Sequence, residues 1–339
     1  MKNIIKLILF LFSTLQVFSQ TGIGKYAGDF LSLGAGARAL GMGGANIAIA
    51  NDANAGYWNP AGLSNVNYYQ FSLMHEEHFG NLVNYNFASI AIPFNDEYTF
   101  GVSVLRLAVD GIPDTRNALF DANGDGILDI TTDFLDKSKI TEFSDADWAL
   151  FFSASKKINE KINIGANLKL ISRAIAEYSA FGIGFDLGLQ YKYSSNLILG
   201  VTIQDITTTL VAWETGKNEL ISPTVKLGGA YKIKVGHSVF MPTIDFDVRF
   251  ENRRFASNYN IGFISFDFHG GMEYSYKNLF SIRAGYNDVK QLTFGAGINF
   301  PMIQFDYSFA RIAEDTNFRF DDTHRISILI TLKNEKYSR

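Results

Sequence analysis

Residues 178–193 read YSAFGIGFDLGLQYKY, and their strict alternation decides the fold. The odd positions from Phe181 to Tyr193 are all apolar or aromatic, whereas the even positions between them hold Gly, Asp, Gln or Lys. A period of two is typical of a β-strand whose two faces meet different surroundings. Here one face is wholly apolar and ends in a pair of tyrosines, and the other face is small or polar.

The same alternation recurs in segments near 238–250, 265–276, 291–300, 302–312 and 324–333. Strands of ~10 residues that alternate in this way, with aromatic residues at the membrane interfaces, are typical of outer-membrane β-barrels. A soluble β-sandwich also alternates, but its outward face carries many Lys, Glu and Thr. Because the polar face here is rich in Gly and in charges of mixed sign, we expect an all-β, transmembrane, antiparallel β-barrel.

Candidate strands number about fourteen, which is an even count as in bacterial barrels. They lie near 68–74, 82–92, 98–107, 147–156, 161–173, 179–193, 195–206, 223–233, 238–250, 265–276, 279–287, 291–300, 302–312 and 324–333. Short turns alternate with longer connections, and in such barrels the short turns face the periplasm. We therefore expect a barrel over 67–333, a tail over 334–339, and both chain ends in the periplasm.

The first 19 residues have the features of a signal peptide. Lys2 and Lys6 precede an apolar stretch that is too short to span a bilayer as an anchor helix. We expect cleavage after Ser19, or alternatively after Gln20, following Sec-dependent export toward the bacterial outer membrane. The chain has no cysteine, which excludes disulfides and thiol catalysis, and its net charge of −4 argues against nucleic acid as a partner.

Residues 34–63 read GAGARALGMGGANIAIANDANAGYWNPAGL and precede the first strand. Small residues allow backbones to approach closely, and a barrel of fourteen strands has room for more than its own side chains. We expect 20–66 to form a periplasmic segment and a hatch that enters the lumen from the periplasmic end. Arg38 and Asp52 would pair with charges on the lumen face, because a confined charge needs a partner. Those charges are Asp186, Asp245, Asp247, Arg249, Asp267, Glu273, Arg283 and Asp306.

This segment resembles the N-terminal signature of the PorV/PorQ family, which is related to the FadL-type fatty-acid transporters. The hatch of those transporters carries a similar Asn-Pro-Ala-Gly. Stretches 101–115 and 143–150 and the last strands are also similar to that family, so the resemblance covers essentially the whole mature chain. The positions that carry the hatch signature are Gly36, Arg38, Gly41, Gly43, Gly44, Asp52, Trp58, Asn59, Pro60 and Gly62.

The resemblance implies a non-enzymatic role in type IX protein secretion. A PorV-like barrel takes cargo with C-terminal signal domains from the translocon to the attachment complex, so those proteins and outer-membrane lipid would be the partners. One alternative is a FadL-like outer-membrane channel for hydrophobic small molecules, and another is a paralogue with a different partner. A channel needs an apolar lumen pocket and a kink or gap in the wall. The Gly, charged and amide residues of the lumen face favour the secretion role.

One possible metal site stands out. Asp121, Asn123, Asp125 and Asp129 place oxygen ligands at alternate positions, with Gly126 for a tight turn, as in the start of a calcium loop. Position twelve is Thr rather than the Glu of an EF-hand, so the segment resembles the shorter loops of dockerins and thrombospondin-type repeats. The alternative is an exposed acidic turn. Calcium would be the one cofactor of this chain, and none is required.

The five histidines show no catalytic partner at motif spacing. His75 and His78 share a predicted outer loop with Glu76 and Glu77, and this cluster either binds a metal or is simply solvated. We find no active site in the sequence and expect that the protein is not an enzyme.

Overall fold

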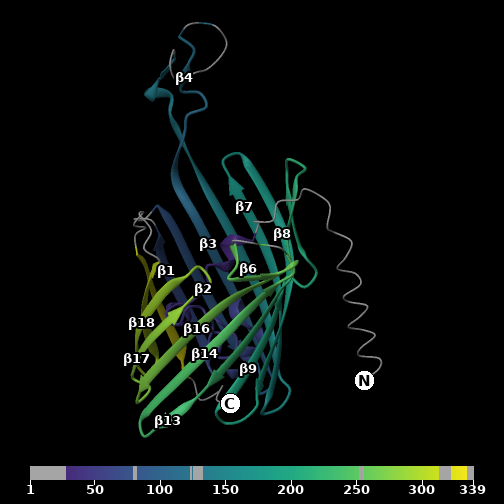
Figure 1. Cartoon of the computed structure of the whole chain (residues 1–339), viewed down its shortest axis with the longest axis vertical. Helices are drawn as coiled ribbons and strands as arrows, with labels where there is room; N and C mark the ends of the chain where they lie inside the picture. Colours follow the sequence, from purple (N-terminus) through teal and green to yellow (C-terminus); the bar gives the residue numbers. More distant parts are fainter. Residues whose placement is uncertain are drawn as a thin grey trace, which may run out of the picture.

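The computed structural model describes residues 28–78, 82–122, 124, 133–251, 253, 256–312 and 322–333. Its main feature is a closed antiparallel β-barrel (Figure 1). The first strand, β1 (Tyr69–His78), pairs with the last, β20 (Thr323–Leu332), so the sheet closes on itself. The wall has fourteen strand positions, which confirms the predicted fold class. The expected signal peptide and the C-terminal tail lie outside the described residues.

Most positions in the wall are filled by one strand, and neighbouring strands in the chain are neighbours in the barrel. These strands are β2 (Val83–Pro93), β3 (Tyr98–Asp114), β6 (Thr141–Lys157), β7 (Ile162–Ile175), β8 (Tyr178–Lys192), β14 (Ser238–Arg249), β16 (Ile264–Tyr276), β17 (Phe280–Tyr286), β18 (Gln291–Asn299) and β19 (Ile303–Ile312).

Two positions are interrupted, which the sequence did not predict. β9 (Leu197–Gln204) and β10 (Thr209–Trp213) both pair with β8, and between them Asp205 and Thr208 have φ values of 53° and 58° that break the ladder. The next position holds β11 (Asn218–Ile221), β12 (Thr224–Tyr231) and β13 (Ile233–Val235), and a short β15 (Tyr259–Ile261) pairs with the start of β16. Much of the predicted loop 207–222 is therefore part of the wall.

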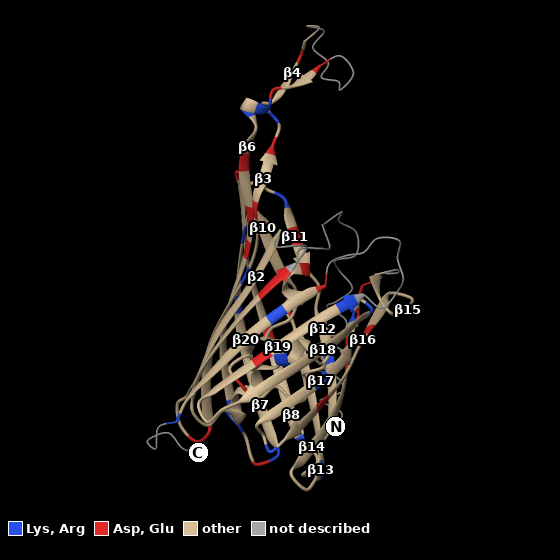
Figure 2. Ribbon diagram, turned by 90° about the vertical axis from the view of Figure 1, so that its left-hand side faces the viewer, with Lys and Arg blue, Asp and Glu red and all other residues tan. Residues whose placement is uncertain are grey.

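The two faces of the wall follow the predicted alternation. In β8, Phe181, Ile183 and Phe185 point outward and are about half exposed, whereas Asp186 points inward and is buried. Much of the outer wall is uncharged in Figure 2, as a lipid-facing surface requires. None of the helices in the described part of the chain is long and apolar enough to cross a membrane.

A hairpin projects beyond the barrel at the end where the long loops lie (Figures 1 and 2). It is the continuation of β3 and β6 past a register shift between Val109 and Ile112, and it carries β4 (Leu119–Phe120), β5 (Phe134–Leu135) and the 3-10 helix η3 (Lys137–Lys139). The sequence predicted a loop over much of this region. The hairpin forms because the two strands continue to pair with each other after their neighbours have ended.

The hatch, defined here as residues 28–66, lies inside the barrel. It contains the 3-10 helix η1 (Asp29–Ser32), the short helices α2 (Ala37–Leu40) and α3 (Ala55–Trp58), and the 3-10 helix η2 (Pro60–Asn65). Gly28 lies against Ile221 at the long-loop end, whereas Asn65 bonds Gln190 near the short-turn end. The described hatch therefore runs from the long-loop end toward the short-turn end, and the expected approach from the short-turn end is not seen in these residues.

Candidate functional site

Glycines on the inner face of the wall give the hatch its space. A Cβ atom on Gly200 of β9 would lie 2.5 Å from the carbonyl oxygen of Ile47, and one on Gly228 of β12 would lie 2.8 Å from the Ile47 Cβ atom. Real Cβ atoms essentially never come this close to such neighbours. Gly271 and Gly285 are packed against the hatch backbone at Met42 in the same way, so that a Cβ atom on either would clash with it. The Gly-rich inner face is therefore a docking surface for the hatch.

The hatch glycines make the matching approach from the inside. Gly43 has a φ of 68°, and a Cβ atom there would lie 2.7 Å from the backbone nitrogen of Tyr286 in β17. Both the backbone angle and the lack of space exclude a larger residue. The other signature glycines, Gly36, Gly41, Gly44 and Gly62, are also buried within the hatch.

Arg38 is held by the wall of the barrel. Its Nε and Nη2 atoms donate to the two carboxylate oxygens of Glu273 in β16 at 2.9 and 3.0 Å, and its Nη1 donates to Asn51 at 2.9 Å. Glu273 also accepts from Arg283 of β17, which in turn bonds Asp306 of β19 at 2.7 Å. Burial alone lowers the pKa of Arg38, but the Glu273 carboxylate outweighs this and raises it, so the guanidinium stays charged.

Arg38→Ala is expected to weaken the attachment of the hatch. The substitution removes two charged hydrogen bonds while Glu273 keeps Arg283, so the free energy of unfolding should fall by about 2 kcal/mol. Urea unfolding in detergent micelles measures this change, and ion conductance in a planar bilayer should rise as well. Arg311→Ala is the matched control, because its ion pair with Asp322 is exposed and should contribute little. Equal losses in both variants, or unchanged conductance in Arg38→Ala, would contradict the role of Arg38.

Asp52 does not reach a lumen cation. Its Oδ1 atom accepts a hydrogen bond from the backbone nitrogen of Asn54 at 2.9 Å, and so it stabilises a turn within the hatch. Burial raises the pKa of Asp52, and the charge of Arg38 offsets only part of that effect. The predicted ion pair between Asp52 and a wall residue is therefore not seen among the described residues.

The Trp58-Asn59-Pro60 motif forms hydrogen bonds within the hatch and to the wall. Trp58 donates from its indole nitrogen to the carbonyl of Ala35 at 2.7 Å. Asn59 donates to the carbonyls of Ile47 and Leu189 at 3.0 Å each, which links two parts of the hatch to β8. Its side-chain oxygen accepts from the Ala61 nitrogen, and Pro60 stands at the start of η2, where its missing N–H costs nothing.

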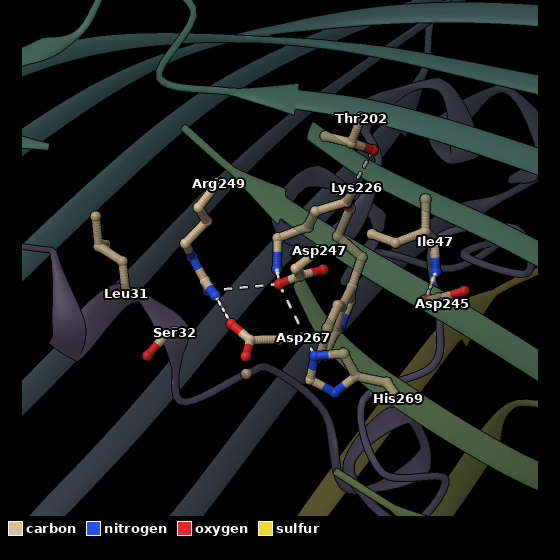
Figure 3. Close-up of polar contacts among 12 residues, drawn as sticks. Leu31, Ser32, Ile47, Thr202, Lys226, Asp245, Asp247, Arg249, Asp267 and His269 are labelled. Carbon is tan, nitrogen blue, oxygen red and sulfur yellow. Dashed lines mark hydrogen bonds and ion pairs between the residues drawn. The ribbon is translucent and has the colours of Figure 1, made fainter. Parts of the chain in front are cut away.

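A second charged network lies between the hatch and strands β12, β14 and β16 (Figure 3). Asp247 bonds Lys226 at 2.5 Å, and Asp267 pairs with both Arg249 and Arg253. His269 contacts the hatch directly, because its Nδ1 atom lies 2.8 Å from the carbonyl oxygen of Gly43, which can only accept.

Asp245 completes the contact between this wall and the hatch. Its Oδ2 atom accepts a hydrogen bond from the backbone nitrogen of Ile47 at 2.8 Å (Figure 3). The eight predicted lumen charges are all on the inner face, and each is bound by an opposite charge or by a hatch donor. Asp186, for example, bonds Lys169 at 3.4 Å. Charges confined in a lumen are stabilised by such partners.

Several inward ionic residues were missed by the sequence analysis. Lys169 of β7 also pairs with Asp205 at 2.7 Å, and Arg325 of β20 pairs with Glu76 of β1 at 2.7 Å. Both cations occupy inward positions of alternating strands, which is the signal that could have identified them. Glu76 was assigned to a loop, whereas the structure places 75–77 in β1 with Glu76 inward and His75 and Glu77 outward, so these three side chains do not converge on one metal site. The side chain of His78 lies outside the described part of the chain. No group of metal-ligating side chains occurs among the described residues.

A cavity of about 670 Å³ opens between the hatch and the wall at the long-loop end. Its apolar lining includes Leu31 and Tyr57 of the hatch, Phe151 of β6 and Ile221 of β11. Charged side chains such as Lys169, Lys226 and Arg253, and uncharged polar ones such as Ser222 and Thr224, also line it. Asp29 of η1 borders it as well, and burial raises the pKa of Asp29 although nearby arginines oppose that shift.

The predicted calcium loop is only partly described. Asp121 accepts a hydrogen bond from the Gly124 nitrogen at 2.6 Å, which is the local turn that such a loop needs. Asn123, Asp125 and Asp129 lie outside the described residues. Calcium binding by this segment stays a prediction.

Comparisons with protein-family models and with curated proteins give no match. Among solved structures, the Ralstonia pickettii toluene transporter TbuX is similar with a TM-score of 0.59 and 12% identity, over 88% of this chain and 99% of that one. The Pseudomonas putida toluene transporter TodX has a TM-score of 0.54 and 15% identity, over 89% and 99%. A Pseudomonas aeruginosa FadL homologue has a TM-score of 0.54 and 13% identity, over 88% and 98%. The chain therefore has the fold of the FadL-type outer-membrane barrels.

Proposed function

We propose that this chain is a non-enzymatic outer-membrane channel that admits small hydrophobic molecules from outside the cell. The observation that carries the proposal is the cavity at the long-loop end, where apolar side chains of the hatch and of the wall face one space. Its volume is within the range of about 300–1,000 Å³ that is usual for small-molecule sites. The fold is also that of barrels described as toluene transporters, so a monoaromatic hydrocarbon is the natural probe.

The composition of the inner face no longer argues against a channel. The sequence analysis took its glycines and charges as evidence against an apolar pocket. In the structure, glycines such as Gly200 and Gly228 are covered by the hatch backbone, and the charges are tied into ion pairs. Lys226 and Arg249 also line the cavity, but each is paired with a carboxylate, and the apolar lining comes from other positions such as Leu31 and Phe151.

Passage requires a path around or through the hatch. The strands from β1 through β3 pair continuously along the wall, so no gap opens in that part of the described barrel. We infer that a bound molecule leaves the cavity when the centre of the hatch shifts.

Equilibrium binding of labelled toluene to the purified full-length barrel tests the site. Ile221→Trp should fill the cavity and weaken binding about tenfold, since it occludes most contacts of a small ligand. Ile261→Trp is the control, because Ile261 is outward on β15 and does not line the cavity. The proposal fails if the wild type binds no toluene, or if Ile221→Trp binds it as tightly as the wild type.

A role in type IX secretion is the second candidate, and the projecting hairpin favours it. The hairpin carries Phe120 and Phe134, which contact each other at a ring distance of 4.9 Å and are each about half exposed. Such a projection could contact the translocon, the attachment complex or the C-terminal signal domain of a cargo protein. Deleting the gene and measuring secretion of such cargo tests this role. Normal secretion of such cargo in the deletion strain would rule out this role.

A further inference from the structure

Arg106 of β3 is a cation on the outer face of the barrel, and no carboxylate among the described residues forms an ion pair with it. Its neighbour Leu105 points into the lumen and is fully buried, so Arg106 points to the side where lipid lies. The guanidinium lies over the ring of Trp148, 5.5 Å from its centre. Every other arginine in the described part of the chain forms an ion pair with a carboxylate. Arg106 therefore keeps an uncompensated positive charge.

A groove of about 480 Å³ lies beside Arg106 on the same face. Ala88 of β2 stands between Leu73 of β1 and Val104 of β3 in the register of the sheet, and its small side chain leaves a trough between the two larger ones. Ile326 of β20 extends the apolar wall and, like Leu73, is 57% exposed. The groove is thus apolar along its floor and carries the free guanidinium of Arg106 at one border.

The groove lies nearer to the long-loop end of the wall. Arg106 pairs in register with Asn86, which is only three residues after the start of β2. His75 of β1 lies beside Asn86 and bonds its side-chain oxygen at 2.8 Å, so the polar border continues from β3 to β1. An outward arginine is tolerated best near the membrane interface, where aromatic side chains such as Trp148 are also typical.

We propose that this groove binds a phosphorylated acyl lipid of the surrounding membrane. One acyl chain would lie over Ala88, and a phosphate would accept hydrogen bonds from Arg106. A guanidinium presents donors in a planar fork that matches phosphate geometry, and a lipid without a phosphate offers no such acceptor. The site is separate from the lumen, so it stands whether or not the barrel carries hydrocarbons.

The test uses the purified full-length barrel in dodecyl maltoside, titrated with lipid A and followed by native mass spectrometry. Wild type should bind lipid A with a defined stoichiometry. Arg106→Gln should weaken this binding about tenfold, the loss expected for one charged hydrogen-bonding group. Ala88→Phe should weaken it as much, because the ring fills the trough while Arg106 remains.

Two comparisons distinguish specific lipid binding in the groove from non-specific lipid binding to the barrel. Arg311→Gln removes another outward arginine, one already paired with Asp322, and should leave lipid A binding unchanged. Lipid A without its phosphates should bind the wild type about tenfold more weakly, as Arg106→Gln does. The proposal is overturned if Arg106→Gln or Ala88→Phe binds like the wild type, or if removal of the phosphates has no effect. Heat-modifiability on gels identifies any variant that has not folded. Arg106→Lys keeps the positive charge but not the planar fork, so it should retain part of the lipid A binding.

Discussion

Gly228→Val is expected to turn the sealed barrel into an open pore, whereas Gly229→Val next to it leaves the barrel sealed. Gly228 faces the hatch, and a Cβ atom there would lie 2.5 Å from the Asp245 carboxylate and 2.9 Å from the Ala48 nitrogen. Gly229 faces outward, and a Cβ atom there would meet only ordinary contacts at 3.8 Å. The two substitutions are chemically identical and differ only in whether the new side chain lies on the inner or the outer face of the wall.

The reason for the large effect is the size of the lumen. A barrel of this strand number is wider than its own side chains fill, so displacement of the hatch leaves a water-filled passage. Val also suits a β-strand, so neither variant should lose the strand itself. Planar-bilayer recordings should show a steady ion current for Gly228→Val and a baseline close to wild type for Gly229→Val.

Gly200→Val provides an independent check of the same contact. Gly200 is on β9 and approaches the Ile47 carbonyl from the neighbouring strand position. It should therefore give the same open state as Gly228→Val. The account of the hatch would be contradicted if both inward variants fold, as judged by heat-modifiability, and yet conduct no more than Gly229→Val.

Joining the centre of the hatch to the wall by a disulfide is expected to stop passage of a hydrophobic molecule. Asn54 of the hatch and Ser89 of β2 are in contact, with the Ser89 hydroxyl 3.3 Å from the Asn54 side-chain oxygen. The chain has no cysteine, so the double variant Asn54→Cys, Ser89→Cys introduces the only two thiols. Cells that produce this variant with its disulfide formed should take up labelled toluene no faster than cells without the protein. Reduction of the disulfide should restore uptake.

A second cysteine pair is the matched control for this lock. The hydroxyls of Ser64 and Ser155 also touch, but Ser64 belongs to η2, a few residues before β1. That end of the hatch is already anchored by the chain, so Ser64→Cys, Ser155→Cys should permit uptake in both redox states. Full uptake by the oxidised Asn54–Ser89 pair would show that the centre of the hatch does not need to move.

The fold could be read from the sequence because each wall strand repeats one local rule. A segment such as 178–193 places apolar residues outward and small or polar residues inward without reference to the rest of the chain. The interruption at Asp205 and Thr208 and the extension of β3 to Asp114 were missed for the opposite reason. They depend on which strands still have a partner at that height, and no local pattern records this.

The candidate site was predictable in its members but not in its pairings. The signature singled out Arg38, and the inward position of Glu273 was visible from alternation. Which wall charge meets Arg38 is set by the stagger of the strands and by the path of the hatch. The same is true of the direction of the hatch, because a run of small residues fits the lumen equally well from either end. Lys169 and the Arg325–Glu76 pair could have been placed inward, but not matched to their partners.

The most direct test of the account is the initial rate at which intact cells take up labelled toluene. Two strains are compared that differ only in whether they produce this barrel, with outer-membrane integrity checked in both. The account predicts a several-fold faster initial rate in the strain that has the barrel, and a return to the lower rate with Ile221→Trp. Equal rates in the two strains, with the barrel present and folded in the outer membrane, would contradict it.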